Sequence, residues 1–350
     1  MTLSALRPTW HKITHWEYWP MHLVYFPIYL LWGYYAIRAR SLFFFNAVNP
    51  GIKNGGLFME SKMAIYKLLP RKFYPKTILV KTGFHAMDLK KILNKNGLKF
   101  PLIAKPDIGL RGSAVMKINS NADLYHYHRK ANFAYLIQDF IPYANEIGVF
   151  YVRFPKEKKG FISGLVHKEP LTVTGNGRSN LEELLNQNPR FRFQLKALKK
   201  EYGSKLDTVL EKGKKQILVP YGSHCRGAKF EDHKHLITPK LTKTINKMCT
   251  QIEGFYYGRL DIMYNSMEEL ERGKNFMIVE INGAKSEPTH IYDPKHSLFF
   301  GWKEIARHIR YMYFISRQNH RHSSASYLNY KTGMREFLAH FSHNKKIAGF

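Results

Sequence analysis

The chain has 350 residues, 44% of them hydrophobic, and carries 55 Lys and Arg against 26 Asp and Glu, a formal net charge of +29. Its size allows one large catalytic unit with appendages. The two cysteines and scattered histidines lack metal-ligand spacing, which argues against a disulfide framework and a zinc centre and fits a reducing cytosol. The charge predicts an acidic partner. Because no nucleic-acid motif accompanies it, an anionic membrane surface or a polyphosphate is favoured over nucleic acid.

Aromatic residues concentrate at the N-terminus, where four of the five tryptophans fall within the first thirty-two residues. Residues 19–37 contain no Lys, Arg, Asp or Glu, and this run approaches the ~20 residues that span a bilayer. Pro20 and Pro27 disfavour a straight spanning helix. We therefore expect 1–56 to be a membrane-associated segment, monotopic or peripheral, on the cytoplasmic side of the membrane. The alternative is an aromatic lid packed on the catalytic core.

The next chemical signals are two lysines and a glycine-containing loop. Lys62 stands in a helical run at 59–62, and Lys105 ends a short apolar strand at 100–106. The loop after this strand brings together small residues and one cation: Gly109, Arg111, Gly112 and Ser113. Glycine lets backbone N–H groups approach phosphate oxygens closely, while the cations supply charge. The spacing is not that of a Walker loop, and an ordinary hairpin loop is the alternative.

Polar side chains alternate with apolar ones in two later segments, which predicts a pair of adjacent strands. The first segment carries Arg259 and Asp261, and the second carries Glu280 and Asn282. Carboxylate and amide oxygens are hard donors that suit Mg2+ bound together with substrate phosphates. These residues therefore predict a nucleotide-metal site. Solvated residues at a sheet edge are the alternative.

In their order along the chain, these segments resemble the ATP-grasp superfamily over roughly residues 57–294. The resemblance implies an α+β fold in which two α/β lobes clamp ATP, with a catalytic domain at 57–300. It implies that Lys62 and Lys105 bind ATP phosphates together with the loop, and that Arg259 steadies the reacting carboxyl phosphate. Its Mg2+ ligands would be Asp261, Glu280 and Asn282.

The resemblance also implies which residues bind the adenosine end of ATP. The segment 136–141 is similar to the family's hinge strand, which lies along adenine. The residues assigned to adenine and ribose are Gln138, Asp139, Phe140 and Ile141 for the adenine edge and Glu146 for the ribose hydroxyls.

Two subfamilies share further features with the chain. D-alanyl-D-alanine ligases show the same succession of lysines, glutamate, Arg-x-Asp and Glu-x-Asn. The stretch 171–185 is similar to a segment of cyanophycin synthetases, and Ser179 with Glu182 predicts a capping box. Only sixty-one residues precede Lys62, too few for the first domain of those D-alanine ligases, which puts D-alanine specificity in doubt.

The implied reaction is an ATP-dependent ligation of a carboxylate to an amine through an acylphosphate, on amino-acid or peptide-like substrates. Alternatives are an ATP-grasp phosphotransferase and a nucleotide-sensing membrane adaptor without turnover. Candidate acceptor contacts lie in two loops: Arg226 and Gly227, and Lys285, Glu287 and His290. A His224–Cys225 dyad is disfavoured because neighbours on a strand point to opposite faces.

Two further segments complete the chain. Lys168 is interpreted either as an extra phosphate contact or as an exposed lysine. Apolar residues recur at helical spacing over 302–315, which predicts a helix in a basic C-terminal region at 301–350. Packing against the core is the simpler expectation for this helix, and a basic amphipathic helix on a membrane surface is the alternative. The polar tail from residue 319 onward has no assigned role.

Overall fold

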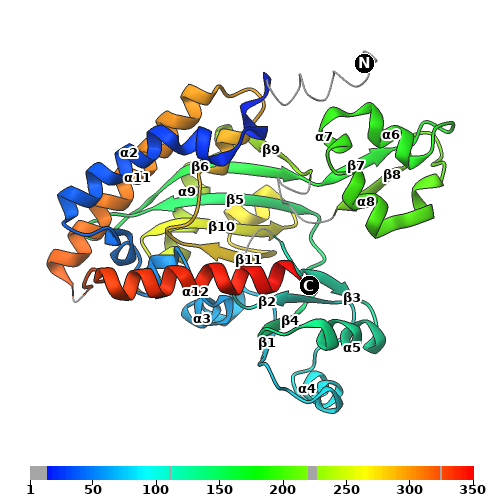
Figure 1. The fold of residues 1–350 in the computed structure, drawn as a ribbon, viewed down its shortest axis with the longest axis horizontal. Coiled ribbons are helices and arrows are strands. Elements are labelled where there is room, and N and C mark those ends of the chain that lie inside the picture. Colours follow the sequence, from blue (N-terminus) through cyan, green and yellow to red (C-terminus); the bar gives the residue numbers. More distant parts are fainter. Residues whose placement is uncertain (1–13, 110–111, 220–226, 324) are drawn as a thin grey trace.

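The computed structural model describes residues 14–109, 112–219, 227–323 and 325–350. Two antiparallel sheets form its centre (Figure 1). The small sheet has the order β1-β4-β2-β3, and the large sheet has the order β11-β10-β5-β6-β9. The small-sheet strands are β1 (Thr77–Val80), β2 (Leu102–Pro106), β3 (Met116–Ile118) and β4 (Tyr135–Asp139). The large-sheet strands are β5 (Asn145–Val152), β6 (Phe161–Glu169), β9 (Lys229–Asp232), β10 (Tyr257–Tyr264) and β11 (Phe276–Asn282).

Helices cover both faces of the large sheet because its strands alternate apolar side chains between two cores. Val149 and Tyr151 of β5 pack in the core that contains α9 (Pro239–Cys249). Phe150 and Val152 point the other way, into the core that contains α11 (Leu298–His322). The helix expected at 302–315 is therefore present, is longer than expected, and packs against the sheet.

The small sheet has its own core with two short helices, α4 (Leu89–Lys95) and α5 (Asn121–Lys130). The chain's last helix, α12 (Tyr330–Ala348), also reaches this core through Ile347. Sequence reasoning gave this segment no role. Its C-terminal end supports the loop after β2, where His343 Nε2 lies 3.0 Å from the carbonyl oxygen of Ile108.

A peripheral unit lies beyond one end of the large sheet (Figure 1). Its elements are β7 (Leu171–Thr174), β8 (Lys215–Val219), α6 (Leu181–Gln187), α7 (Pro189–Arg192) and α8 (Leu195–Tyr202). The capping box expected from Ser179 and Glu182 is one residue later, at Asn180 and Glu183, because Asn180 has the extended backbone that an N-cap requires.

The N-terminal run forms one helix, α2 (Met21–Ala39), with Pro20 as its N-cap and Pro27 inside it. It lies against α11, and the two helices share the second core of the large sheet. None of the described helices has both the length and the hydropathy that crossing a bilayer requires. The inner face of α2 thus packs on α11 and the large-sheet core, as the lid alternative anticipated, while its other face is exposed.

Candidate functional site

Lys62 is held at the start of a helix by the loop after β2. The helix α3 (Lys62–Leu68) begins at this lysine, not at Met59, because Met59 has a φ of 57° and Ser61 caps the helix. The carboxylate of Asp107 accepts hydrogen bonds from Ser61 Oγ and the Met63 N–H, both at 2.9 Å. The Lys62 ammonium lies 3.1 Å from the carbonyl oxygen of Gly109. The helix start and the loop therefore form one unit.

Lys105 bridges the two sheets. From β2 of the small sheet, its ammonium donates to the Val279 carbonyl of β11 at 3.1 Å and to the Tyr66 hydroxyl at 3.0 Å. The same hydroxyl accepts from Gln138 Nε2 at 3.1 Å and donates to the Val279 carbonyl. Sequence reasoning missed Tyr66, which α3 places between the sheets. Burial lowers the pKa of Lys105 to about 8.

The two acidic strands pair as expected. β10 and β11 are antiparallel neighbours, with Asp261 opposite Glu280 and Arg259 opposite Asn282. Side chains directly opposite on one face lie close together, so the two carboxylates are neighbours. Asp261 and Asn282 are only 4% and 5% exposed, which rules out the solvated-edge interpretation for them.

Asp261 is the centre of a buried ion-pair cluster. Arg259 donates to both of its oxygens, from Nε at 2.8 Å and from a terminal nitrogen at 3.1 Å. Lys168 of β6 lies 3.0 Å from Asp261 Oδ1 and 2.6 Å from Glu146 Oε1. The side chain of Lys168 is 4% exposed, so the exposed-lysine interpretation is wrong. Lys168 instead joins β6 to the strands that carry the carboxylates.

Both carboxylates of the facing strands are ionised. Burial alone would favour their neutral forms, but Arg259 and Lys168 overcome this and lower the pKa of Asp261 to about 2. Burial likewise opposes the charge of Glu280, while Lys62 and Lys285 lower its pKa overall. Lys62 Nζ lies 3.5 Å from Glu280 Oε1, so a cation from the small-sheet side faces an anion of the large sheet.

These residues fit Mg2+ by their chemistry. When phosphates supply further ligands, Mg2+ is usually bound by one or two protein carboxylates. Two ionised carboxylates on one face meet this requirement. Among the described residues, the buried amide nitrogen of Asn282 has no hydrogen-bond partner, and as a donor it suits a phosphate oxygen beside the ion. Within the described residues, no group of three or more His, Cys, Asp or Glu could hold a metal ion.

The predicted adenine segment ends β4. Gln138 is 2% exposed, and its amide also donates to Thr77 Oγ1 at 2.8 Å. The Asp139 N–H donates to the Lys76 carbonyl at 2.9 Å. Phe140 is 40% exposed with the Lys117 ammonium 4.3 Å from its ring centroid, and Ile141 is buried. Phe140 thus presents an accessible aromatic surface just after β4.

The structure describes only part of the loop that is predicted to bind phosphate. Gly112 and Ser113 are exposed, and Gly112 has a φ of 71°, a conformation that glycine adopts without strain. Arg111 lies outside the described residues, as do His224, Cys225 and Arg226. Their predicted roles stay predictions.

The loop after β11 meets the N-terminal helix. Glu287 accepts from the Tyr25 hydroxyl of α2 and from the Tyr292 hydroxyl, the latter at 2.9 Å. Lys285 pairs with Glu60, and His290 Nε2 lies 3.3 Å from Glu304 Oε2 of α11. All three candidate acceptor residues of this loop are therefore held by other elements.

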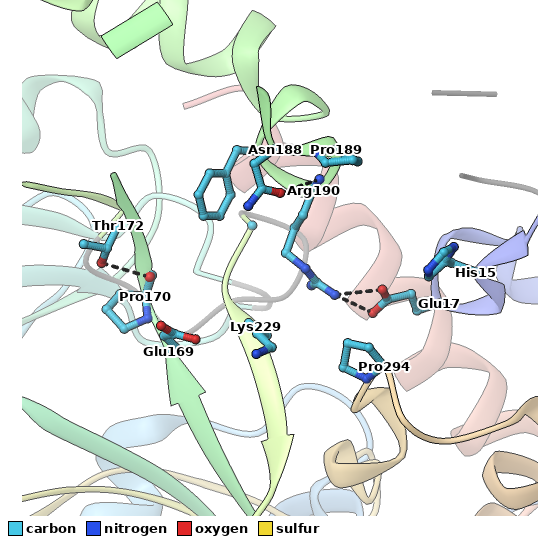
Figure 2. Close-up of a pocket in the computed structure, with 12 residues that line it drawn as sticks. His15, Glu17, Glu169, Pro170, Thr172, Asn188, Pro189, Arg190, Lys229 and Pro294 are labelled. Atoms are coloured by element: carbon cyan, nitrogen blue, oxygen red, sulfur yellow. Dashed lines mark hydrogen bonds and ion pairs between the residues drawn. The ribbon is translucent and has the colours of Figure 1, made fainter. Parts of the chain in front are cut away.

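A separate cleft of about 380 Å³ opens beyond the end of β6 (Figure 2). Glu169, the residue after Lys168, lines it, and so do Thr172 and Lys229. Figure 2 shows Arg190 of α7 pointing to Glu17 of the N-terminal segment, with contacts of 2.7 and 2.9 Å. Of the residues that the structure describes, none predicted for ATP or Mg2+ lines this cleft.

Comparison with known proteins gives distant matches. No family model matches the sequence. The glutathione biosynthesis bifunctional protein of Clostridium perfringens is 24% identical over 150 residues, which cover 38% of this chain and 19% of that protein. Solved structures that match in part include D-alanine–D-alanine ligase from Bacillus anthracis in complex with ATP, at 12% identity and a TM-score of 0.42 over 75% of this chain and 67% of that one. Another is a bifunctional glutathione synthetase from Pasteurella multocida, at 14% identity and a TM-score of 0.39 over 75% of this chain and 38% of that one.

By their names, these matches are a D-alanine–D-alanine ligase and two proteins of glutathione synthesis. They are the kind of protein that the motifs resemble, and the chain spans well under half the length of the two bifunctional proteins. In this chain itself, Lys62 faces the carboxylate of Glu280, and Lys105 donates to the carbonyl of the neighbouring Val279.

Proposed function

We propose that this protein is an ATP-dependent ligase that joins a carboxylate to an amine through an acylphosphate intermediate. The main support is the arrangement around Glu280. Lys62 lies 3.5 Å from its carboxylate, Lys105 donates to the carbonyl of the preceding residue Val279, and Asp261 lies opposite it on β10. Phosphoryl transfer requires mainly positioning and neutralisation of charge, and this set of residues supplies both.

Each side chain has a role in the proposed reaction. Lys62 and Lys105 bind phosphate oxygens of ATP, and Lys105 is cationic at neutral pH because its pKa is about 8. Arg259 holds the charge that develops on the acyl phosphate, while its contact with Asp261 fixes its orientation. Asp261, Glu280 and Asn282 would hold Mg2+, which when bound would neutralise the charge of the transferring phosphoryl group.

A second substrate is assigned to the cleft of Figure 2. Its lining contains both signs of charge, from Glu169 and Lys229, together with the hydroxyl of Thr172, and such polar groups would orient a small amino-acid-like molecule. Thr172→Trp fills part of this cleft. It should raise KM for one substrate while leaving KM for ATP unchanged.

The reaction is tested by phosphate release from ATP and Mg2+ with pooled carboxylic acids and pooled amines, each alone and together. A ligase releases phosphate only when both are present. With an acid and hydroxylamine in place of the amine, it forms a hydroxamate, which reports the acylphosphate. Glu280→Gln should lower the rate by at least about a hundredfold. The matched control is Glu268→Gln, whose side chain is 72% exposed.

Other outcomes point to other functions. ADP formation that needs a single hydroxyl acceptor would establish a phosphotransferase instead. ATP binding without turnover under all these conditions would establish a nucleotide-sensing adaptor.

A further inference from the structure

The helix α2 has a solvent-exposed apolar stripe. Leu23, Phe26, Leu30 and Ile37 recur at intervals of three, four and seven residues, and they are 57%, 64%, 68% and 78% exposed. This spacing puts them on one side of the helix. The opposite side carries the buried residues Val24, Ile28 and Tyr35. The inner apolar side is covered by the protein core. The outer apolar side is exposed, and such a patch marks a surface that binds another apolar partner.

The helix is held rigidly in place by its inner side. Trp302 Nε1 of α11 donates to the Val24 carbonyl at 2.7 Å, and the rings of Tyr35 and Tyr313 stack at 4.6 Å. Because residue numbers rise together in both contacts, the two helices run parallel, as Figure 1 shows. The exposed stripe therefore belongs to a fixed surface of the catalytic unit.

Basic residues line the exposed side of the neighbouring helix, α11. Lys303 and Arg310 of α11 are exposed, and together with Arg317 they are spaced by two helical turns, on one side of that helix. Phe299, 77% exposed, lies on the same side of α11. α2 contains no Asp or Glu, and the one acidic residue of α11, Glu304, is buried. The exposed face of this helix pair is thus apolar and basic.

We propose that this face of α2 and α11 docks on an anionic lipid surface. Leu23, Phe26 and Leu30 enter the boundary between headgroups and acyl chains, as the apolar side of an interfacial helix does. Lys303 and Arg310 contact anionic headgroups, which attract basic residues close to the surface.

A second copy of the chain fits this face less well. In a two-fold dimer both copies contribute the same patch, so both basic rows of α11 would enter the interface with no exposed acid from either helix to balance them. An anionic lipid surface complements both the apolar stripe and the charge.

Docking would also place a lipid surface beside the catalytic site. Tyr25, on the same helix as the stripe, bonds Glu287 in the loop after β11. This consequence rests on the proposed function, whereas the docking itself does not.

The test is co-sedimentation of the full chain with vesicles of phosphatidylcholine alone and of equal parts phosphatidylcholine and phosphatidylglycerol. We expect stronger binding to the anionic vesicles. Phe26→Ser with Leu30→Ser should weaken that binding by more than about a hundredfold. The matched control removes an equal pair from α12, Leu338→Ser with Phe341→Ser, which are 61% and 58% exposed, and should bind like wild type.

The charge is tested separately. Lys303→Glu with Arg310→Glu should remove the preference for anionic vesicles, while Lys90→Glu with Lys91→Glu on α4 should keep it. Absence of vesicle binding, or equal losses in the α2 and α12 variants, would overturn the proposal. So would a dimer in sedimentation velocity that Phe26→Ser with Leu30→Ser converts to a monomer, because the occupant would then be a second copy. Phosphate release is assayed without vesicles, so failure of the ligase hypothesis is seen independently.

Discussion

Lys168 Nζ lies 3.0 Å from Asp261 Oδ1, and both side chains are almost completely buried. The same ammonium contacts Glu146, and the same carboxylate contacts Arg259. Two cations thus alternate with two anions across three strands of the large sheet. Each buried charge depends on its neighbours, since removing one leaves another without compensation.

Replacing Lys168 should destabilise the protein strongly. In Lys168→Met, Glu146 loses its partner and Asp261 retains only Arg259, so the free energy of unfolding should fall by about 3–5 kcal/mol. Urea unfolding followed by circular dichroism measures the change. The control, Lys199→Met, removes the ion pair with Glu182, in which the lysine side chain is 52% exposed. It should lower the free energy of unfolding by less than about 1 kcal/mol. Equal losses in the two variants would contradict the importance of burial.

Nucleotide binding should be linked to protonation of Lys105. Burial gives this lysine a pKa of about 8 in the free protein, and the phosphates of a bound nucleotide would raise it. Just above pH 8 the free protein has partly lost this proton, so binding should take up protons, and affinity should fall as the pH rises through this range.

Calorimetry of ATP binding in two buffers of different ionisation enthalpy measures this proton uptake. Lys105→Met, which keeps an apolar stem of similar length, should show a smaller uptake than wild type. If proton uptake were unchanged in this variant, groups other than Lys105 would be binding the protons.

The sequence predicted those parts of the site that follow from local pattern. Alternation of polar and apolar residues is a property of a strand by itself, so Asp261 and Glu280 could be placed on one face before their pairing was known. The antiparallel register adds that they lie opposite each other. The start of α3 was misjudged because the positive φ of Met59 leaves no periodic signal.

Features that depend on distant segments could not be predicted. From the sequence, Tyr66 is indistinguishable from an ordinary core residue. Its role follows only from the folded structure, in which its hydroxyl donates to the Val279 carbonyl of β11. Lys168 sits near other lysines in the sequence, and only the pairing of three strands shows that it is buried between carboxylates. The apolar run of α2 indicated an unusual environment, but its division into a packed side and an exposed side depends on α11.

The packing of α2 can be tested with two adjacent tyrosines. Tyr35 is 8% exposed and stacks on Tyr313, whereas Tyr34 is 51% exposed. Tyr35→Ala should lower the free energy of unfolding by about 3 kcal/mol through lost burial and a cavity. Tyr34→Ala should change it by less than about 1 kcal/mol. A small effect in both would mean that α2 does not pack on the catalytic unit in solution.

Gly148 should be required for the geometry of the ion-pair cluster. It lies opposite Asp261 in the pairing of β5 with β10. An added Cβ would lie 2.8 Å from Val166 Cγ1, 3.2 Å from Arg259 Cδ and 3.3 Å from Asp261 Oδ1. Because Asp261 is held by both Arg259 and Lys168, it cannot move aside without lengthening a charged contact. Gly148→Ala should therefore reduce ligase turnover by at least about tenfold, since small displacements of catalytic groups are costly.

Gly33 supplies the control for this substitution. It lies in α2, where an added Cβ meets no atom within 4 Å, so Gly33→Ala should leave turnover unchanged and raise the free energy of unfolding by about 0.5–1 kcal/mol through helix propensity. Turnover and urea unfolding are measured for both variants. If Gly148→Ala kept wild-type turnover, the cluster would be able to shift without loss, and the position of Arg259 would not limit the reaction.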